Sequence, residues 1–245
     1  YKLNKYDISI AADELYNFTW QVYCDWYLEA MKVLIDNGTE EEKTEIKSAT
    51  KESFRAILIM LHSFIPFVTE ELYQVVPGIK RDKFLATENW INLGFNIKEQ
   101  KTCIPQVMNI VSAVRSVKVA LNSAYKQIPI FVSETLSNEA SLLVSQLAKV
   151  DFTKEDSIPN EMAIKKPYLG GYIICNIDQP DGKNIYKKRL EKELTTNKNN
   201  LNALNAKLSG DFAKNADPGL VAKEKERFAF TEKLVKELEN ELGLL

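Results

Sequence analysis

The stretch from Ile8 to Leu34 limits the fold of this chain more than any other part of its sequence. On a helix of 3.6 residues per turn, its apolar side chains form two rows with a narrow polar strip between them. A helix that is apolar around most of its girth must pack against neighbours on more than one side. The pattern therefore predicts the core of an all-α bundle. The two rows are Ile8, Ala11, Leu15, Phe18, Val22, Trp26, Ala30 and Val33, and Tyr16, Trp20, Tyr23, Tyr27, Met31 and Leu34.

Two further helices are predicted directly after the first one. The pair Asn37-Gly38 is a helix-stop signal, and Thr39 with Glu42 has the spacing of a capping box for the next helix. That helix should end before Pro66, where a shorter third helix is expected to follow. The first part of the chain is thus expected to be helical throughout.

The middle of the chain changes character twice. Residues 77–105 contain many turn formers and are expected to cross the surface, and a helical period returns over residues 106–122. Between residues 126 and 181, the β-like runs "IPIFVS" and "GYIICNI" flank an apparent helix at residues 138–148. These runs predict a small α/β module with an antiparallel or mixed sheet.

The last part of the chain carries two heptad seams separated by the short break "SGDFAKNADPG". Two such helices joined by a short break should fold back as an antiparallel hairpin. The expected fold is therefore mainly α, with a helical bundle and long crossing at 1–125, a small α/β module at 126–181, and an antiparallel coiled-coil hairpin at 182–245. The seams are Leu190, Leu194, Asn197, Leu201, Leu204 and Leu208, and Val221, Glu224, Phe228, Thr231, Val235, Leu238, Leu242 and Leu245.

Charge is spread unevenly, although the net charge is only −2. From Gly182 onward there are 13 Lys and Arg against 10 Asp and Glu, a net charge of +3, while the remaining residues have 19 against 24, a net charge of −5. A protruding helix with an excess of cations suits a phosphate backbone, although a solvated coiled-coil face has a similar composition. The first hairpin helix has the acids Glu191 and Glu193 and the cations Lys183, Lys187, Lys188, Arg189, Lys192, Lys198 and Lys207.

A second basic stripe lies on the helix that follows Thr39. Lys43, Lys47, Lys51 and Arg55 recur every four residues and therefore share one face. Like charges at this spacing repel by roughly a few tenths of a kcal/mol per pair, so the stripe indicates an anionic partner.

Catalytic and metal chemistry find little support in the sequence. Cys24, Cys103 and Cys175 are scattered and form no metal or redox motif, which is typical of proteins in a reducing cytosol. A free-standing hydrolase using Cys24 or His62 is an alternative, but both residues fall in apolar helices without an oxyanion-hole signature. A packed thiol and a hydrogen-bonded imidazole are favoured instead. No catalytic residue and no metal site are predicted, and no apolar run approaches the roughly 18 residues of a membrane span.

Several segments resemble the valyl-tRNA synthetase family, in an order and spacing that cover essentially all 245 residues. "YNFTWQVYCDWYLEAMK" and "LHSFIPFVTEELYQ" are similar to the anticodon-binding bundle of that family, and "VRSVKVALN" is similar to its next helix. "RLEKEL" and "FAKNADPGLVAKEKER" resemble its C-terminal coiled coil, which the isoleucyl and leucyl enzymes lack.

The resemblance implies that the chain is the C-terminal tRNA-binding region of a valine–tRNA ligase, an ATP-dependent class I aminoacyl-tRNA synthetase. It implies that the first bundle helices precede Tyr1, and that the catalytic domain, which uses ATP and Mg²⁺, and the editing domain belong to the same longer chain. The region itself is expected to hold no cofactor and to catalyse nothing. The expected protein is a cytoplasmic monomer that binds tRNA(Val) and no membrane. A coiled-coil scaffold that binds another protein is the alternative.

The resemblance also implies three groups of tRNA contacts. The anticodon loop should lie near residues 42–51, and the hairpin cations should contact the outer corner of the tRNA. Two basic positions of the family's helix at residues 114–122 imply contacts to the tRNA body, although one of them is Lys where Arg is common, which weakens a bidentate phosphate contact. The candidates are Lys43, Lys47, Lys51 and Arg55 with Ile46 and Thr50 as base neighbours at the anticodon end, Arg115 and Lys118 on the body, and the seven cations named above on the hairpin.

Overall fold

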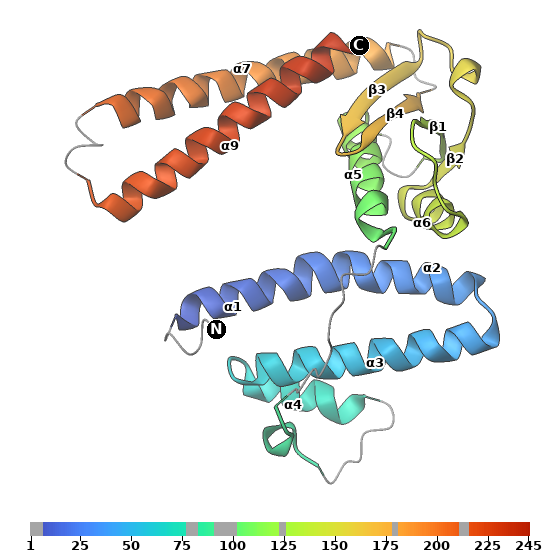
Figure 1. The fold of residues 1–245 in the computed structure, drawn as a ribbon, viewed down its shortest axis with the longest axis vertical. Coiled ribbons are helices and arrows are strands. Elements are labelled where there is room, and N and C mark those ends of the chain that lie inside the picture. The colour runs from blue at the N-terminus through green and yellow to red at the C-terminus, as the bar shows by residue number, and fades with distance from the viewer. Residues whose placement is uncertain (1–6, 77–82, 91–101, 123–125, 178–180, 211–215) are drawn as a thin grey trace. The chain divides into compact units, whose positions relative to one another are not determined.

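The computed structural model describes two compact units, Tyr1–Thr102 and Cys103–Leu245 (Figure 1). Each unit is described by itself. The described residues are 7–76, 83–90, 102–122, 126–177, 181–210 and 216–245. The predicted crossing at 77–105 and the predicted break before Pro218 therefore fall partly outside the described residues.

The first unit is a set of helices arranged along one long helical rod. The rod runs without a break through α1, η2 and α2, and α3 folds back along it (Figure 1). The segment η2 is a π-helix, in which each amide bonds five residues back rather than four. The elements are α1 (Ile8–Asn17), η2 (Phe18–Leu28), α2 (Glu29–Asn37), α3 (Glu40–His62), α4 (Pro66–Val75) and η3 (Leu85–Thr87).

The start of α3 confirms the predicted capping box. The Thr39 hydroxyl accepts a hydrogen bond from the Glu42 amide at 3.3 Å, and the Thr39 amide donates to the Glu42 carboxylate at 2.7 Å. His62 at the other end shares a 2.9 Å hydrogen bond with the Thr69 hydroxyl, as expected for a structural imidazole. The core between α3, α4 and η3 consists of Phe54, Leu58, Ile59, Tyr73, Val76 and Leu85.

The rows predicted for residues 8–34 are buried only in part. Tyr23 and Ala30 are buried, whereas Tyr16, Phe18 and Trp20 are exposed. Two physical reasons explain the difference. The π-helix changes the period on which the rows were drawn, and α3 is the helix that covers this rod within the first unit.

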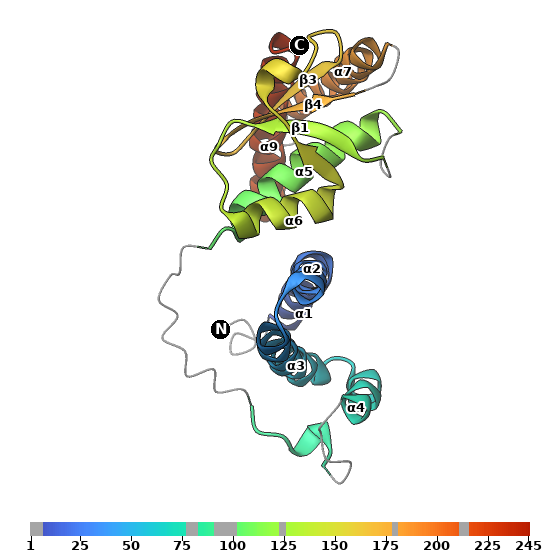
Figure 2. The ribbon, with the colours of Figure 1, turned by 90° about the vertical axis from the view of Figure 1, so that its right-hand side faces the viewer.

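The second unit contains a four-stranded mixed sheet in the order β2-β1-β4-β3. Strands β1 and β2 are parallel, and β4 is antiparallel to both β1 and β3. Helices α5 and α6 lie side by side and cover the sheet (Figure 2). The elements are α5 (Ile104–Ala120), β1 (Ile128–Val132), α6 (Asn138–Ala148), β2 (Val150–Phe152), η4 (Glu155–Ser157), β3 (Ala163–Tyr168) and β4 (Gly171–Asn176).

Helix α5 belongs to this second unit. The sequence placed it at the end of the first part, which was expected to extend to residue 125, but the compact units divide between Thr102 and Cys103. The reason is that its apolar face packs against α6, β3 and β4 and is completely buried there. That face consists of Val107, Ile110, Val111, Val114 and Val117.

The antiparallel hairpin is confirmed. Helices α7 (Gly182–Ser209) and α9 (Pro218–Gly243) pack along each other, with the C-terminal end of α9 beside the start of α7 (Figure 1). The polar seam positions find their partners within the hairpin. The Asn197 amide and the Thr231 hydroxyl donate to carbonyls of their own helices, and Glu224 pairs with Lys207 at 3.0 Å.

The capping box generates a stability prediction. Thr39→Ala should lower the free energy of unfolding of the first unit by about 1 kcal/mol, because it removes the acceptor for the first turn of α3. Urea unfolding followed by tryptophan fluorescence reports on this unit, since all three tryptophans lie within it.

Thr44→Ala is the matched control. The Thr44 hydroxyl also bonds within α3, to the Glu40 carbonyl at 2.8 Å, but it does not satisfy a free amide. Its replacement should leave the midpoint unchanged or raise it, since Ala is the better helix former. Equal losses in both variants would show that the cap does not stabilise this helix.

Candidate nucleic-acid interface

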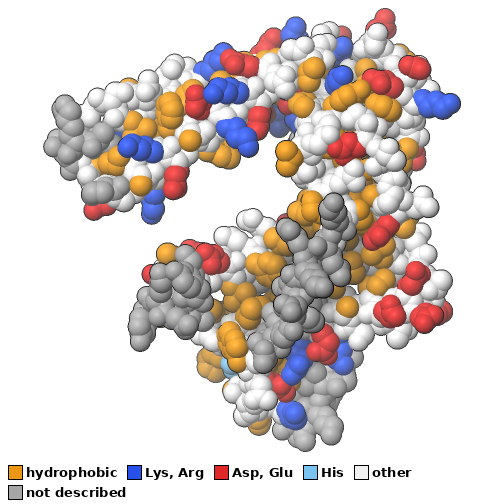
Figure 3. Space-filling model, in the orientation of Figure 1, with side chains coloured by type: hydrophobic (Ala, Val, Ile, Leu, Met, Phe, Trp, Pro, Cys, Tyr) orange, Lys and Arg blue, Asp and Glu red, His pale blue; other side chains and the backbone are white. Residues whose placement is uncertain are grey.

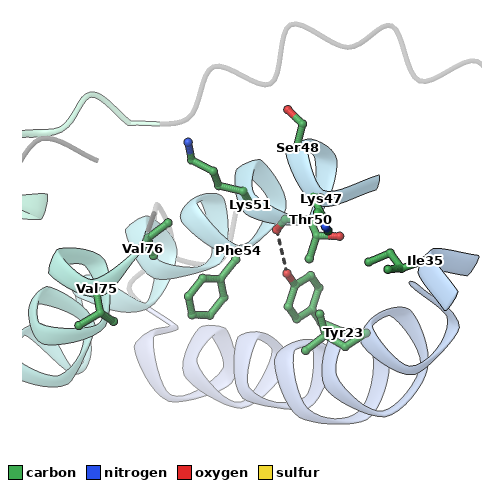
Figure 4. Close-up of a pocket in the computed structure, with 10 residues that line it drawn as sticks. Tyr23, Ile35, Lys47, Ser48, Thr50, Lys51, Phe54, Val75 and Val76 are labelled. Atoms are coloured by element: carbon green, nitrogen blue, oxygen red, sulfur yellow. Dashed lines mark hydrogen bonds between the residues drawn. The ribbon is translucent and has the colours of Figure 1, made fainter. Parts of the chain in front are cut away.

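The first unit contains an open groove between α3, the rod and the end of α4 (Figure 4). Its volume is about 900 Å³. Most of the lining is apolar, and the two charged residues among those that line it are Lys47 and Lys51. The lining residues are Tyr23, Leu28, Ile35, Lys47, Ser48, Thr50, Lys51, Phe54, Val75 and Val76.

Aromatic rings form part of the groove. Tyr23 stacks on Tyr27 with ring centroids 5.1 Å apart, and its hydroxyl donates to the Thr50 carbonyl at 3.2 Å (Figure 4). Burial raises the pKa of Tyr23 above its usual value, so the ring stays neutral under physiological conditions. Phe54 points toward the same space from α3. The groove thus combines a neutral apolar surface with two ammonium groups, which suits a flat apolar group that carries a negative charge.

The basic stripe of α3 divides into two kinds of residue. Lys47 and Lys51 line the groove, and neither pairs with an acid among the described residues. Lys43 pairs with Glu40 at 2.9 Å, on the first turn of the same helix. Arg55 bridges to Glu88, so its charge is already matched.

Arg55 has a structural role that its spacing could not reveal. Glu88, which lies next to η3, accepts hydrogen bonds from both Arg55 and the Tyr73 hydroxyl, the latter at 2.8 Å. The bond from Tyr73 and the neighbouring guanidinium lower the pKa of Glu88. This network ties the segment after α4 back to α3.

The two candidate base neighbours differ in position. Thr50 lines the groove, and its hydroxyl shares a 3.4 Å hydrogen bond with the Tyr27 hydroxyl. Ile46 is half-buried and does not line the groove. Sequence reasoning missed Tyr23 and Phe54 as groove residues. The only signal for Tyr23 was its place on an apolar row of the first helix, and the signal for Phe54 was its place among the apolar residues of α3 itself.

Lys118 is a correction to the predicted contacts of the tRNA body. It is 1% exposed, and its ammonium group donates to the carbonyls of Lys126, Ala148 and Lys149 at 2.6, 2.7 and 2.8 Å. All three of its protons are therefore used inside the protein, and burial lowers its pKa. Arg115, on the same helix, is exposed and donates to the Leu147 carbonyl at 3.1 Å.

The seven cations of α7 also differ in what they contact. Lys187, Lys188 and Lys192 are exposed and have no ion pair with any described residue. Three cations pair with acids: Arg189 with Glu193 at 3.1 Å, Lys198 with Glu239 at 2.6 Å and Lys207 with Glu224 at 3.0 Å. The seventh, Lys183, donates to the Asn160 carbonyl at 3.4 Å.

These exposed ion pairs leave the hairpin open to an anionic partner. Basic and acidic side chains are interspersed along it (Figure 3). Exposed pairs contribute only about 0–1 kcal/mol, so a phosphate can compete for their cations. The exposed cations of α7 that lack an ion pair with any described residue therefore all lie in the short segment Lys187–Lys192.

Other kinds of site find no support in the part of the chain that the structure describes. Within it, no group of three or more His, Cys, Asp or Glu side chains is placed to hold a metal ion. None of its helices is both long enough and apolar enough to cross a membrane.

The comparisons agree with a nucleic-acid interface. Residues 1–134 match the family described as the anticodon-binding domain of tRNA ligase, and the chain belongs to that family. It is similar to proteins named valine–tRNA ligase from Bartonella henselae, with 30% identity over 239 residues, and from Petrotoga mobilis, with 29% identity over 255 residues. These matches cover 92% and 97% of this chain but only 26% and 28% of the relatives. The chain thus spans about a quarter of the length of these relatives.

The buried lysine generates a second prediction. Lys118→Met should lower the free energy of unfolding of the second unit by about 3 kcal/mol, because three carbonyls lose a charged donor. Urea unfolding followed by far-UV circular dichroism measures this loss. Lys154→Met, at an exposed lysine of the same unit with no partner among the described residues, should have little effect. Unchanged stability combined with weaker RNA binding in the Lys118 variant would restore the original assignment.

Proposed function

We propose that this chain binds tRNA(Val) as the C-terminal region of a valine–tRNA ligase. The observation that carries the proposal is the groove of the first unit, which lies in the part of the chain that matches the anticodon-binding family. Bases of single-stranded RNA loops stack on aromatic and apolar side chains, and lysines bind the phosphates beside them. Lys47 and Lys51 are the proposed phosphate contacts, and Phe54, which is only half-buried, is the proposed base contact beside the buried Tyr23.

The hairpin is proposed to add affinity without reading sequence. Lys187, Lys188 and Lys192 carry this role, with Arg115 as a further contact from α5. Phosphate contacts release condensed counterions, so they strengthen binding to any tRNA and weaken with salt. Recognition of tRNA identity would come from the bundle, where bases as well as phosphates are contacted.

The remainder of the proposal concerns the longer enzyme. Aminoacylation with ATP and Mg²⁺ would take place in another domain of that enzyme, which would act as a cytoplasmic monomer. The relatives named valine–tRNA ligase and their much greater length support this part. The three free thiols are consistent with a reducing compartment.

The groove can be tested with RNA alone. The Lys47→Ala/Lys51→Ala variant should bind an anticodon stem-loop RNA about tenfold more weakly, with a shallower dependence on salt, since two phosphate contacts are lost. Fluorescence anisotropy across a salt titration measures both quantities. Lys32→Ala/Lys83→Ala removes two exposed lysines of the same unit that do not line the groove. Equal affinities of the two double variants would exclude the groove as the RNA site.

The hairpin needs a full-length tRNA. The Lys187→Ala/Lys188→Ala/Lys192→Ala variant should bind full-length tRNA several-fold more weakly and reduce the salt slope by about 2–3, while binding of the stem-loop stays unchanged. The matched control removes the three exposed lysines Lys223, Lys225 and Lys233 from α9. If the α7 variant binds as tightly as the parent at every salt concentration, the hairpin contacts another protein or packs within the enzyme.

A further inference from the structure

An ion pair between a buried carboxylate and a half-buried lysine joins the hairpin to the sheet. The Lys166 ammonium on β3 donates to both carboxylate oxygens of Glu241 near the end of α9, at 2.9 and 2.7 Å. The Tyr186 hydroxyl near the start of α7 donates to the same carboxylate. Glu241 is 4% exposed and Tyr186 is 2% exposed, and burial raises the pKa of Tyr186, which keeps its hydroxyl protonated. One carboxylate thus joins the sheet and both helices of the hairpin.

Forming this ion pair has a large desolvation cost. Removing two charges from water costs several kcal/mol per ion, and well-packed apolar residues of similar volume often hold a structure as firmly. Apolar contacts, however, allow sliding and rotation, whereas three converging hydrogen bonds are satisfied in one geometry only. The fully buried seam residues also lie at this end, since Leu190, Val235 and Leu238 are buried and the rest of the seam is half-buried. Packing alone already secures the root of the hairpin.

We infer that Lys166, Glu241 and Tyr186 set the direction in which the hairpin leaves the α/β module, and that they are positioning residues for RNA binding. The second half of this inference rests on the function proposed above. Helix α7 has 28 residues and rises about 42 Å at roughly 1.5 Å per residue, so a change of about 10° at its root moves its far end by roughly 7 Å. The proposed contacts Lys187, Lys188 and Lys192 lie about 8–15 Å from the start of α7, so the same change moves them by roughly 1–3 Å, which is enough to lengthen a phosphate contact beyond hydrogen-bond distance.

The direction of the hairpin can be measured without RNA. Nitroxide labels at Gln146→Cys on α6 and Asn202→Cys on α7 place one exposed label on the module and one on the hairpin. Cys24 and Cys103 are replaced by Ser, and the buried Cys175 is retained. Pulsed electron paramagnetic resonance then gives the distribution of distances between the labels in the full 245-residue chain.

The informative variant is Lys166→Met/Glu241→Leu, which removes both charges and keeps apolar volume. A single substitution would leave a charged partner unpaired and would strongly destabilise the module, whereas the double variant removes both charges together. We expect the double variant to keep its helix content but to unfold at a lower midpoint, because the buried Tyr186 hydroxyl loses its acceptor, and we expect its distance distribution to become at least twofold broader. Lys166→Arg keeps the ion pair and should keep the distribution narrow. An unchanged distribution in the double variant would overturn the inference.

The matched control acts two residues away on the same helix. Glu239→Gln removes the exposed partner of Lys198, another contact between α7 and α9, but leaves the pair of Lys166 and Glu241 intact. Its distance distribution should equal that of the parent. A distribution as broad as that of the double variant would mean that any interhelical charge sets the direction, and would overturn the assignment to the pair of Lys166 and Glu241.

Binding of full-length tRNA completes the test. The double variant should bind about fivefold more weakly than the parent, while the anticodon stem-loop binds equally well to both. A broad distribution with unchanged tRNA affinity would overturn the positioning role. The failure of the proposed function looks different, since the α7 lysine variant would then bind tRNA normally while the label distances still broaden in the Lys166→Met/Glu241→Leu variant.

Discussion

The burial of α5 is the constraint on which the second unit depends. Five of its aliphatic side chains are 0–1% exposed between the sheet and α6, and each contributes about 1.5–3 kcal/mol relative to an exposed position. Lys118, on the same helix, adds a charged contact to this packing. Its ammonium group donates hydrogen bonds to carbonyls at the C-terminal end of α6. With α5 fixed in this way, the sheet has a rigid edge at β3 on which the hairpin can be mounted.

The first unit shows the opposite balance between packing and exposure. Its long rod carries more apolar surface than α3 buries, and part of that surface forms the groove beside Lys47 and Lys51. Two ammonium groups beside an apolar surface cannot be buried in a core without acidic or hydrogen-bonding partners. The same combination suits contacts with RNA bases and phosphates. The same aromatic sequence that buries Tyr23 in the bundle therefore also lines the groove that we propose binds RNA.

Charge has two separate tasks in the hairpin. Exposed cations on α7 have weak partners or none, so they remain available to a polyanion and sensitive to salt. In the pair of Lys166 and Glu241 the carboxylate is buried and the lysine half-buried, so this pair is less accessible to solvent than the exposed pairs. Residues of the same type are thus proposed to bind the polyanion at the surface and to orient the hairpin at its root, and burial distinguishes the two groups.

Local sequence signals determined most of the elements of this protein. The capping box at Thr39, the helix at residues 138–148, the two β-like runs and the hairpin all follow from interactions within a few residues, and the structure confirms them. Only the tertiary structure decided which basic residues are free. Lys118 finds two of its three carbonyls 30 and 31 residues away, Arg55 finds Glu88 33 residues away, and Lys166 finds Glu241 75 residues away. Spacing along a helix predicts which side chains share a face, but the partner that occupies that face arrives from a distant part of the chain and is fixed only when the apolar surfaces pack.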